Sequence, residues 1–551
     1  MALIIYKSFF TTLFIYFTGI TFSNLLLSKD FKKSIFDEIF IGFAVIGFVA
    51  LFLNFFLPLS KSINTIVFIT ISLCSIFIIK NFNKEEILKN FIYIFLITLL
   101  SAILIYKSDL FRPDAGLYHL PYTKILNEEK IVLGLSNLHF RFGHVSILQY
   151  INAINFNFIL SSDGILFPIS ILASTFIIFL IREFISTIKI SNFYYQYFIV
   201  LTLFFSVTYL DRYSNYGNDA SGFIYAFLCL IYFYKINNSY LKNNFYIHEI
   251  LILFSIFGFL NKSFLILLLL IPLYFVRKEN IINILKNKIT LFSFFFLSLW
   301  IIKNILISGC ALYPSTITCL DLTWSNLPKT VYYEIAGEAA SKGYLDIIKY
   351  QISEEKISMS EFNKNFNWLG VWSKYHLLVI IEKLIPIIFF ITMLFFYKIY
   401  FSKKKLIIRN NENIFILTIS LLGIIIWFLK FPLYRYGISY IAIFIICASI
   451  LIFYKFEISL LKKKEIYFIS SFCLIIFLGI NFKRIANNFE DNKSLPSLYF
   501  MGRDISYKKI NINDGHYFYA TSECLYEKSL CTHLTDISIK YKEINGYKVF
   551  Y

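Results

Sequence analysis

Long apolar runs alternate with short polar segments along most of the chain. Many of these runs have roughly 17 to 25 residues, the length that a helix needs to cross about 30 Å of hydrocarbon. Runs of this kind are apolar on all sides, which is typical of membrane spans rather than of surface helices. The pattern predicts about 14 transmembrane helices. They lie at 4–27, 36–57, 63–79, 90–106, 163–181, 195–210, 218–234, 248–260, 264–276, 289–307, 379–397, 412–429, 436–454 and 465–481.

Some apolar segments are shorter than the others. Residues 248–260 and 264–276 are short for a crossing. Residues 146–160 are expected to lie in the membrane interface, because counting them as a span would put the basic loops on opposite faces. The first run has no small-residue cleavage site after it, so we expect it to remain as a span.

Composition supports the same class of protein. Of the 551 residues, 58% are hydrophobic and 16% are charged, whereas a soluble domain has about 25% charged residues. This composition excludes a soluble globular domain. The net charge of +18 is explained by Lys and Arg in cytoplasmic loops, so we expect no nucleic-acid partner.

Basic residues set the predicted orientation. Lys and Arg gather in short loops that fall on one face if the spans alternate as given, near 182–189, 235–242, 277–288, 398–409 and 455–464. Because Lys and Arg accumulate in cytoplasmic loops, that face is predicted to be cytoplasmic. Both termini and two long loops, 107–162 and 308–378, then lie outside.

Four cysteines form two close pairs, Cys310 with Cys319 and Cys524 with Cys531. Both pairs fall in segments that the charge rule places outside, where disulfides persist. We therefore predict two disulfides. A metal site is the alternative, although no His stands at ligand spacing beside Cys310 and Cys319.

The tail differs in character from the rest of the chain. It alternates polar and apolar residues, and Asn545-Gly546 stands between two such runs. Asn-Gly in this setting is a strong hairpin signal. We predict a transmembrane domain over 1–482 and a small extracytoplasmic domain, α/β or all β, over 483–551.

The first long loop holds the densest group of polar residues. Asp114 and His119 follow Arg112, and Arg141 and His144 come later in the same loop. A carboxylate just outside the bilayer, flanked by cations, suits a base acting on a substrate whose leaving group is a phosphate. Alternatively, Asp114 caps a juxtamembrane helix and the histidines are interfacial. The grouping favours a site, with Asp114 catalytic and His119, Arg141 and His144 binding substrate.

Further cations lie in or beside later spans on the same predicted face. A cation at the edge of the hydrocarbon is costly and by default marks a functional site, although each could instead snorkel or bind a lipid headgroup. Together, Arg212, Lys262, Lys303 and Arg435 are predicted to form an anion site. Asp219 is a second candidate acid, or a partner for Arg212.

Many spans, an acid in the first large external loop and an external C-terminal portion resemble the GT-C superfamily of glycosyltransferases. This superfamily includes protein mannosyltransferases and aminoarabinose transferases, which take sugars from polyprenyl-phosphate carriers. The segment from Trp300 to Trp324 and the tail around Cys524 also resemble multi-pass proteins from bacterial surface-polysaccharide loci. The likeness covers most of the chain but has no diagnostic motif. One departure is that the superfamily's acid usually follows the first span, whereas Asp114 follows the fourth.

The resemblance implies an all-α polytopic protein of the bacterial inner (cytoplasmic) membrane. It would transfer a sugar from a polyprenyl-phosphate carrier to a glycan, lipid or protein acceptor on the external face. Asp114 would activate the acceptor hydroxyl, and Arg141, Arg212 or Arg435 would hold the carrier phosphate. Some members need a divalent metal and others do not; Asp114 with His119 is the pair that would hold one.

Two alternatives stay open. A surface-polysaccharide polymerase or ligase also works on lipid-linked sugars, and such proteins rely on arginines, so Arg141 and Arg435 would matter more than Asp114. A transporter would have paired charges near the membrane midplane, inverted repeats and broken helices. The short pair 248–260 and 264–276, with Lys262 between them, is the feature that favours it.

Overall fold

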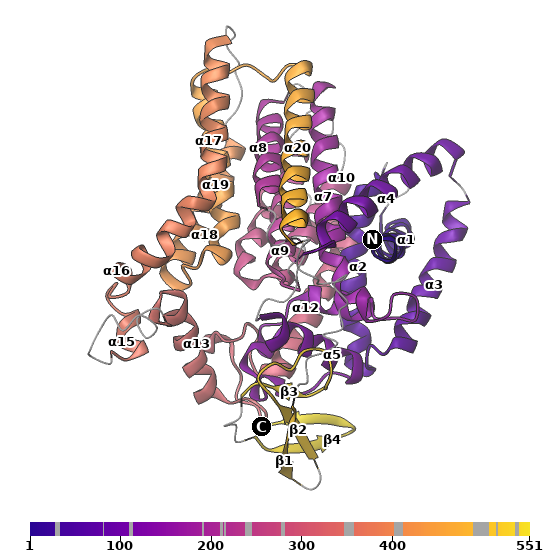
Figure 1. Cartoon of the computed structure of the whole chain (residues 1–551), viewed down its shortest axis with the longest axis vertical. Coiled ribbons are helices and arrows are strands. Elements are labelled where there is room, and N and C mark those ends of the chain that lie inside the picture. Colours follow the sequence, from indigo (N-terminus) through magenta and orange to yellow (C-terminus); the bar gives the residue numbers. More distant parts are fainter. Residues whose placement is uncertain are drawn as a thin grey trace.

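A computed structural model shows a predominantly helical protein with a small strand region near its C-terminus (Figure 1). It describes the chain except for residues 28–32, 81, 109–113, 190–191, 210–212, 214–215, 237–244, 277–280, 346–356, 402–410, 489–505, 514–515 and 535–538. Among the described residues, eleven helices are long and apolar enough to cross a membrane. The chain is therefore a polytopic helical membrane protein.

The eleven long helices lie at eleven of the fourteen positions that the hydropathy pattern predicts. Their bounds are α1 Ala2–Leu26, α2 Ile35–Phe56, α3 Lys61–Ile79, α4 Lys84–Ile105, α7 Phe167–Ser186, α9 Asp219–Ile236, α12 Lys288–Ser308, α17 Leu378–Phe401, α18 Asn411–Lys430, α19 Tyr434–Lys455 and α20 Lys463–Asn487.

The remaining three expected spans correspond to shorter elements, so the expected number of 14 full-length crossings is not confirmed. They are α8 (Phe193–Thr208), α10 (Phe245–Asn261) and a 3₁₀ segment, η7 (Ser263–Leu270) followed by η8 (Pro272–Phe275). The ring of His248 near the start of α10 lies 3.0 Å from the carbonyl of Pro272. Helix α10 and the 3₁₀ segment therefore fold back on each other, with Lys262 at the tip of the hairpin.

The doubtful apolar stretch at 146–160 is not a crossing. It contains α6 (Ile147–Ile154), whose eight residues are all buried. A helix of that length spans only about 12 Å. A capping box at Ser146 and Gln149 starts it, and it packs against α2 and against α5 (Leu120–Glu128). Protein rather than lipid therefore surrounds α6.

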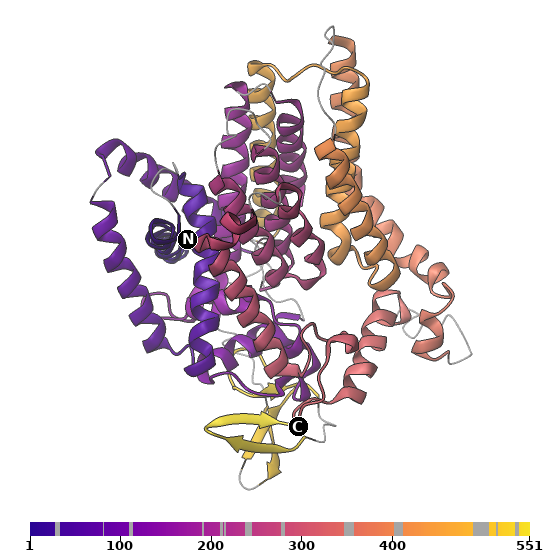
Figure 2. The same ribbon diagram turned by 180° about the vertical axis from the view of Figure 1, so that it is seen from behind.

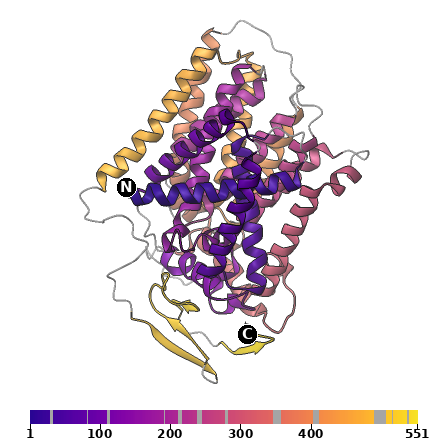
Figure 3. The ribbon, with the colours of Figure 1, turned by 90° about the vertical axis from the view of Figure 1, so that its right-hand side faces the viewer.

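Helices α1 and α2 cross at very close range. A Cβ added to Gly19 would lie 1.7 Å from the carbonyl oxygen of Glu38, and one added to Gly42 would lie 2.1 Å from that of Ile15. Only glycine permits such backbone contact, which is how small residues let membrane helices pack. Figure 3 shows α1 lying across the rest of the bundle.

The two long loops and the tail meet at one end of the molecule. The Asn137 amide, in loop 107–162, donates to the carbonyls of Trp324 at 2.9 Å and Phe550 at 3.0 Å. At the opposite end, Lys398 of α17 pairs with Glu465 of α20 at 2.6 Å (Figures 1 and 2). The N-terminus lies midway along the molecule rather than with the loops and the tail (Figure 1). Which end faces outside, and the side of each terminus, stay predictions.

The C-terminal strands form two small sheets. Strands β1 (Lys508–Asn513) and β2 (His516–Ala520) are antiparallel, and β3 (Cys531–Thr532) is parallel to β2. Strands β4 (Tyr541–Ile544) and β5 (Tyr547–Phe550) form the predicted hairpin. Asn545 and Gly546 at its turn both have positive φ, 50° and 74°, as a tight hairpin turn requires. We call the described residues of 506–551 the strand unit.

The strand unit is joined to the first long loop rather than standing apart. Val549 of β5 pairs with Leu133 as a parallel bridge. Lys548 forms an ion pair with Glu129 at 2.6 Å. The backbone of Leu525 donates to the carbonyl of Gly116 at 3.0 Å. Helix α20 runs to Asn487, a few residues beyond the expected boundary at 482.

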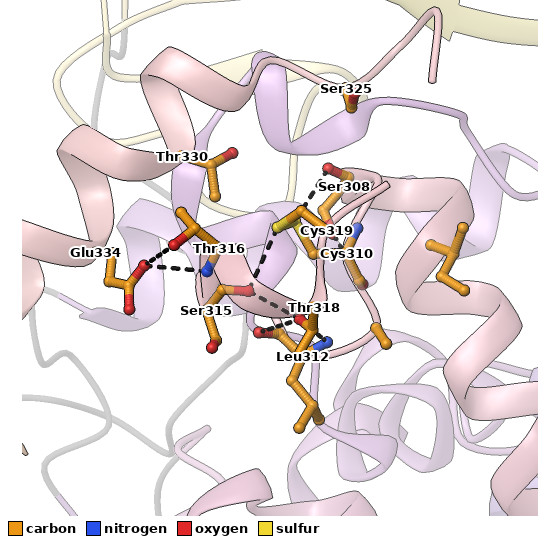
Figure 4. The surroundings of a disulfide bond; sticks show 12 residues. Ser308, Cys310, Leu312, Ser315, Thr316, Thr318, Cys319, Ser325, Thr330 and Glu334 are labelled. Carbon is orange, nitrogen blue, oxygen red and sulfur yellow. Dashed lines mark hydrogen bonds between the residues drawn. A yellow bond between two sulfur atoms is a disulfide. The ribbon is translucent and has the colours of Figure 1, made fainter. Parts of the chain in front are cut away.

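Both predicted disulfides are present, Cys310–Cys319 and Cys524–Cys531. The first closes the loop that follows α12, whose C-cap residue Gly309 has a φ of 82°. Thr316 in that loop donates through its backbone and its hydroxyl to Glu334, at 3.0 and 2.7 Å (Figure 4). Glu334 belongs to α13 (Leu327–Ser341), so the bridged loop is fastened to the next helix.

Candidate functional site

Asp114 and Arg435 form an ion pair although 321 residues separate them. The Arg435 guanidinium donates to a carboxylate oxygen of Asp114 at 3.2 Å. Asp114 immediately precedes η1 (Ala115–His119), and Arg435 is in the first turn of α19. Arg435 is one of the three cations that the family resemblance suggests for the carrier phosphate, and it lies directly beside Asp114.

The turn that carries Arg435 is held by two indoles. Trp427 near the end of α18 donates to the carbonyl of Leu433 at 2.8 Å. Trp372, in the short helix α16 (Leu369–Trp372), donates to the carbonyl of Pro432 at 2.7 Å. The second long loop therefore helps to fix the start of α19. These bonds hold the backbone of Pro432 and Leu433, which directly precede α19.

A second ion pair, between Lys262 and Asp219, is joined to the first through the backbone of Arg435. The Lys262 ammonium is 2.7 Å from Asp219, the first residue of α9, and 2.5 Å from the carbonyl oxygen of Arg435. It also lies 5.0 Å from the centre of the Tyr436 ring. A Cβ added to Gly222 would lie 2.9 Å from Lys262, so the hairpin tip packs tightly on α9. Lys262 thus ties α9, the hairpin and α19 together.

Arg141 completes the cluster. Its guanidinium donates to the Tyr118 hydroxyl at 3.3 Å and lies 4.8 Å from that ring and 5.4 Å from the Phe140 ring. In the part of the chain that the structure describes, it has no ion pair with a carboxylate. Its charge therefore remains available to an anion. We call Asp114, Arg141, Asp219, Lys262 and Arg435 the charged cluster.

The charges around Asp114 decide its protonation. Burial alone would raise its pKa, but the positive charges of Arg435 and Arg141 and the hydrogen bond from Tyr118 outweigh burial. The pKa of Asp114 therefore lies below its ordinary value. The carboxylate is ionised at neutral pH and can accept a hydrogen bond or a proton.

Other residues singled out from the sequence have different surroundings. His119 is buried, with its ring 3.3 Å from the Gln149 amide. Burial lowers the pKa of His119 to about 4, so it is neutral at pH 7 and does not act as a cation. His144 packs its ring against Tyr313, 5.2 Å between centres.

Lys303 does not share the surroundings expected for an anion site. It is fully buried in α12, 3.5 Å from the carbonyl of Val145 and 4.8 Å from the Trp300 ring. Arg212 lies outside the described residues. Of the four cations expected to act together, the structure thus brings together Lys262 and Arg435. Lys262 serves there as a tie between segments rather than as a free cation.

Sequence reasoning missed the aromatic members of the site. Tyr118 contacts Arg141, and Tyr436 contacts Lys262 and Arg435. Tyrosine is so frequent in this chain, with 40 copies, that its presence at these positions does not stand out. The position of Tyr436 directly after Arg435 was the available hint. The indoles of Trp372 and Trp427 could not be assigned without the fold.

The described residues do not form a metal centre. Among the described residues, no group of three or more His, Cys, Asp and Glu side chains could hold a metal ion. Asp114 is paired with Arg435, and His119 is directed to Gln149. The Asp114–His119 pair considered from the sequence therefore lacks both free ligands and further donors.

Comparison with known proteins identifies a family but no activity. Residues 1–442 match the model of a family described as a domain of unknown function (DUF8201). The chain belongs to this family. The matched segment contains every residue of the charged cluster and ends within α19. No curated protein matches the chain, and no solved structure does.

Proposed function

We propose that this protein is a membrane glycosyltransferase that moves a sugar from a polyprenyl-phosphate carrier to an acceptor at the cell surface. The observation that supports this most is the charged cluster, in which an ionised Asp114 lies beside Arg435 and within electrostatic reach of Arg141. Sugar transfer from a phosphate carrier needs these two elements, a carboxylate for the acceptor hydroxyl and cations for the departing phosphate.

Each residue has a distinct role in this proposal. Asp114 accepts the proton of the acceptor hydroxyl as that oxygen attacks the anomeric carbon. The bond from that carbon to the carrier phosphate breaks, and the polyprenyl phosphate leaves as an anion. Arg141 and Arg435 stabilise the phosphate charge, and an arginine fork suits phosphate oxygens. Lys262 and Asp219 hold Arg435 in place through its backbone carbonyl.

The position of the cluster also suits a lipid-linked donor. Arg435 begins α19, a candidate membrane span, and Asp114 follows α4, another candidate span. The carrier's phosphate lies at the membrane surface while its polyprenyl chain stays in the hydrocarbon. A cation at the end of a span meets that phosphate at the right depth. This is why a lipid-linked donor is preferred over a soluble one.

A surface-polysaccharide polymerase or ligase is the second candidate. It is favoured by the convergence of Arg141 and Arg435 on one cluster, because such proteins rely on arginines to hold lipid-linked glycans. The two candidates differ in Asp114. Sugar transfer by the proposed route needs its charge, whereas the polymerase route is expected to tolerate its loss.

The test is transfer by the purified full-length protein in lipid nanodiscs. A panel of radiolabelled undecaprenyl-phosphate sugars is supplied with envelope extract as the source of acceptor. We expect label to move from one of these donors to the extract, and Arg435→Gln to abolish this. Lys430→Gln is the matched control, since Lys430 is exposed and pairs with Glu338 at 3.2 Å. Transfer that survives Arg435→Gln, or no use of any donor in the panel, would contradict the proposal.

A further inference from the structure

Two histidines from distant segments meet where the first long loop contacts the strand unit. Nε2 of His139 lies 3.1 Å from Nδ1 of His533. His139 is fully buried, and His533 directly follows β3. Cys531 of β3 is bridged to Cys524, so His533 is placed by a covalently closed loop. Neither ring hydrogen-bonds to a side chain of the charged cluster.

The hydrogen bonds of this pair fix both tautomers. Nδ1 of His139 accepts the backbone N–H of Arg141 at 3.1 Å. A neutral imidazole has one donor and one acceptor nitrogen, so Nε2 of His139 carries the hydrogen and donates to His533. Both acceptor nitrogens are then occupied. A proton added to Nδ1 of His533 would face the Nε2–H of His139, and a proton added to Nδ1 of His139 would face the backbone N–H of Arg141. Either contact would be repulsive.

We propose that the His139–His533 hydrogen bond fastens part of the strand unit to the segment that carries Arg141, and that acidification releases it. His139 is a positioning residue here, because it acts through the backbone of Arg141. The proposal does not depend on sugar transfer. It concerns how the strand unit is held, whatever reaction the charged cluster supports.

The surroundings of the pair oppose its protonation. The charged and titratable groups that act on His139 are His533, Arg141, His144 and Lys329 of α13, and Arg141 also acts on His533. The rings packed on His139 come from Tyr118, Phe140 and Phe142. In the described part of the chain, no carboxylate ion pair with either ring compensates the positive charges.

The pKa values set the pH range of the effect. Burial, followed by the neighbouring positive groups, lowers the pKa of His139 to about 3. Burial and Arg141 also hold the pKa of His533 below its ordinary value. A histidine whose pKa is lowered by docking stabilises the docked state above its free pKa. That stabilisation is lost progressively as the pH falls through the range below about 6.5.

Release is expected to be local. The Lys548–Glu129 ion pair and the Leu133–Val549 bridge hold the β4–β5 hairpin independently of the histidines. Acidification to pH 5 should therefore loosen peptides around 139–145 and 516–534 while peptides in 541–551 stay protected. The hairpin thus serves as an internal reference within the same molecule.

The test is hydrogen–deuterium exchange of the full-length protein in nanodiscs at pH 7.5 and pH 5.0, with exchange corrected for its intrinsic pH dependence. If one histidine must stay neutral, opening at pH 5.0 is favoured by up to roughly 30-fold. His533→Gln keeps an acceptor for His139 but removes one of the two titrating rings, so the pH response should shrink to the part contributed by His139. His516→Gln is the matched control, because His516 of β2 packs on Tyr541 instead, 4.1 Å between ring centres.

Two results would overturn the proposal. One is equal protection of the wild-type peptides at both pH values; the other is an undiminished response in His533→Gln. A second measurement observes the His139 ring directly. In nitrogen NMR with labelled histidine, the signal that is lost in His139→Gln should show the neutral Nε2–H tautomer at pH 7.5, with Nδ1 as an acceptor. The absence of such a signal would also exclude the proposal.

Discussion

Replacing Asp114 with Asn separates the catalytic role of the carboxylate from its role in stability. The variant keeps the shape of the side chain and removes its charge. The side chains of Asp114 and Arg435 are 37% and 25% exposed, so water screens their attraction, and such pairs contribute about 0–1 kcal/mol. Because the pKa of Asp114 is lowered, this small contribution is present at pH 7 and is lost only as the pH falls through that lowered value.

Activity should respond very differently from stability. Loss of a general base costs roughly 10²- to 10⁴-fold in rate. We therefore expect Asp114→Asn to unfold within about 1 kcal/mol of wild type while its transfer rate falls by at least about 100-fold. The rate is measured in nanodiscs with the donor identified from the undecaprenyl-phosphate panel, and the stability is measured by thermal unfolding of the same preparation.

Asp219→Asn provides the contrast. The side chains of Lys262 and Asp219 are only 12% and 17% exposed, so removing the carboxylate leaves a poorly solvated ammonium. The expected cost is roughly 1–3 kcal/mol of unfolding free energy, more than for Asp114→Asn. If Asp114→Asn retains transfer within tenfold of wild type, the base role is wrong, and a polymerase or ligase that uses Arg141 and Arg435 becomes the better account.

Three further outcomes test the fold. A reporter that is active only outside the cell should work when fused at Tyr551 and fail at Lys404; the reverse pattern would invert the predicted orientation. Thiol labelling of the native protein without reductant should leave the four disulfide cysteines unmodified, and ready modification of all four would exclude both bridges. Gly42→Ala should greatly reduce the yield of folded protein, because the added Cβ would overlap the backbone of α1. Gly479→Ala is the control and should be tolerated, because open space surrounds Gly479. Equal yields of the two variants would contradict the close crossing of α1 and α2.

Much of the architecture follows from local sequence properties. Apolar runs mark the helices because crossing hydrocarbon demands length and hydrophobicity within a single segment. The hairpin at Asn545-Gly546 and both disulfides follow from short-range signals of the same kind. The Ser263–Phe275 segment is an exception, since it is as apolar as a span yet adopts 3₁₀ turns. What shapes it is its packing against α10, which the sequence of the segment does not reveal.

The charged cluster was harder to predict because it is assembled from distant segments. The sequence identified Asp114 as an acid in a polar external loop, and Lys262 and Arg435 as cations beside apolar spans. It could not say that Arg435 would pair with Asp114 while Lys262 would bind a backbone carbonyl. Lys303 carries the same signal and has different surroundings. A charged residue near the membrane is a candidate site residue, but its partner is known only once the tertiary contacts are known.

The pairing of Arg435 with Asp114 has a consequence for the pH dependence of sugar transfer. In the free protein, Arg435 and Arg141 hold the pKa of Asp114 below its ordinary value, which makes the carboxylate a weak base. A donor phosphate would compete for the guanidinium of Arg435 and add a negative charge nearby. Both changes raise the pKa of Asp114, so the base would strengthen when the donor is bound.

This reasoning predicts that the acidic limb of kcat lies at higher pH than the acidic limb of kcat/KM. The first reports the complex with substrate and the second reports the free protein. Because an adjacent opposite charge shifts a carboxyl pKa by about 1–3 units, the two limbs should differ by at least about one unit. Initial rates from pH 4 to 8 measure both. Arg435→Lys is the informative variant, since it keeps a positive charge but loses the fork that Asp114 and phosphate would share, so the separation should shrink. Coincident limbs in the wild-type protein would show that donor binding leaves the Asp114–Arg435 pair intact, and another cation would then have to hold the phosphate.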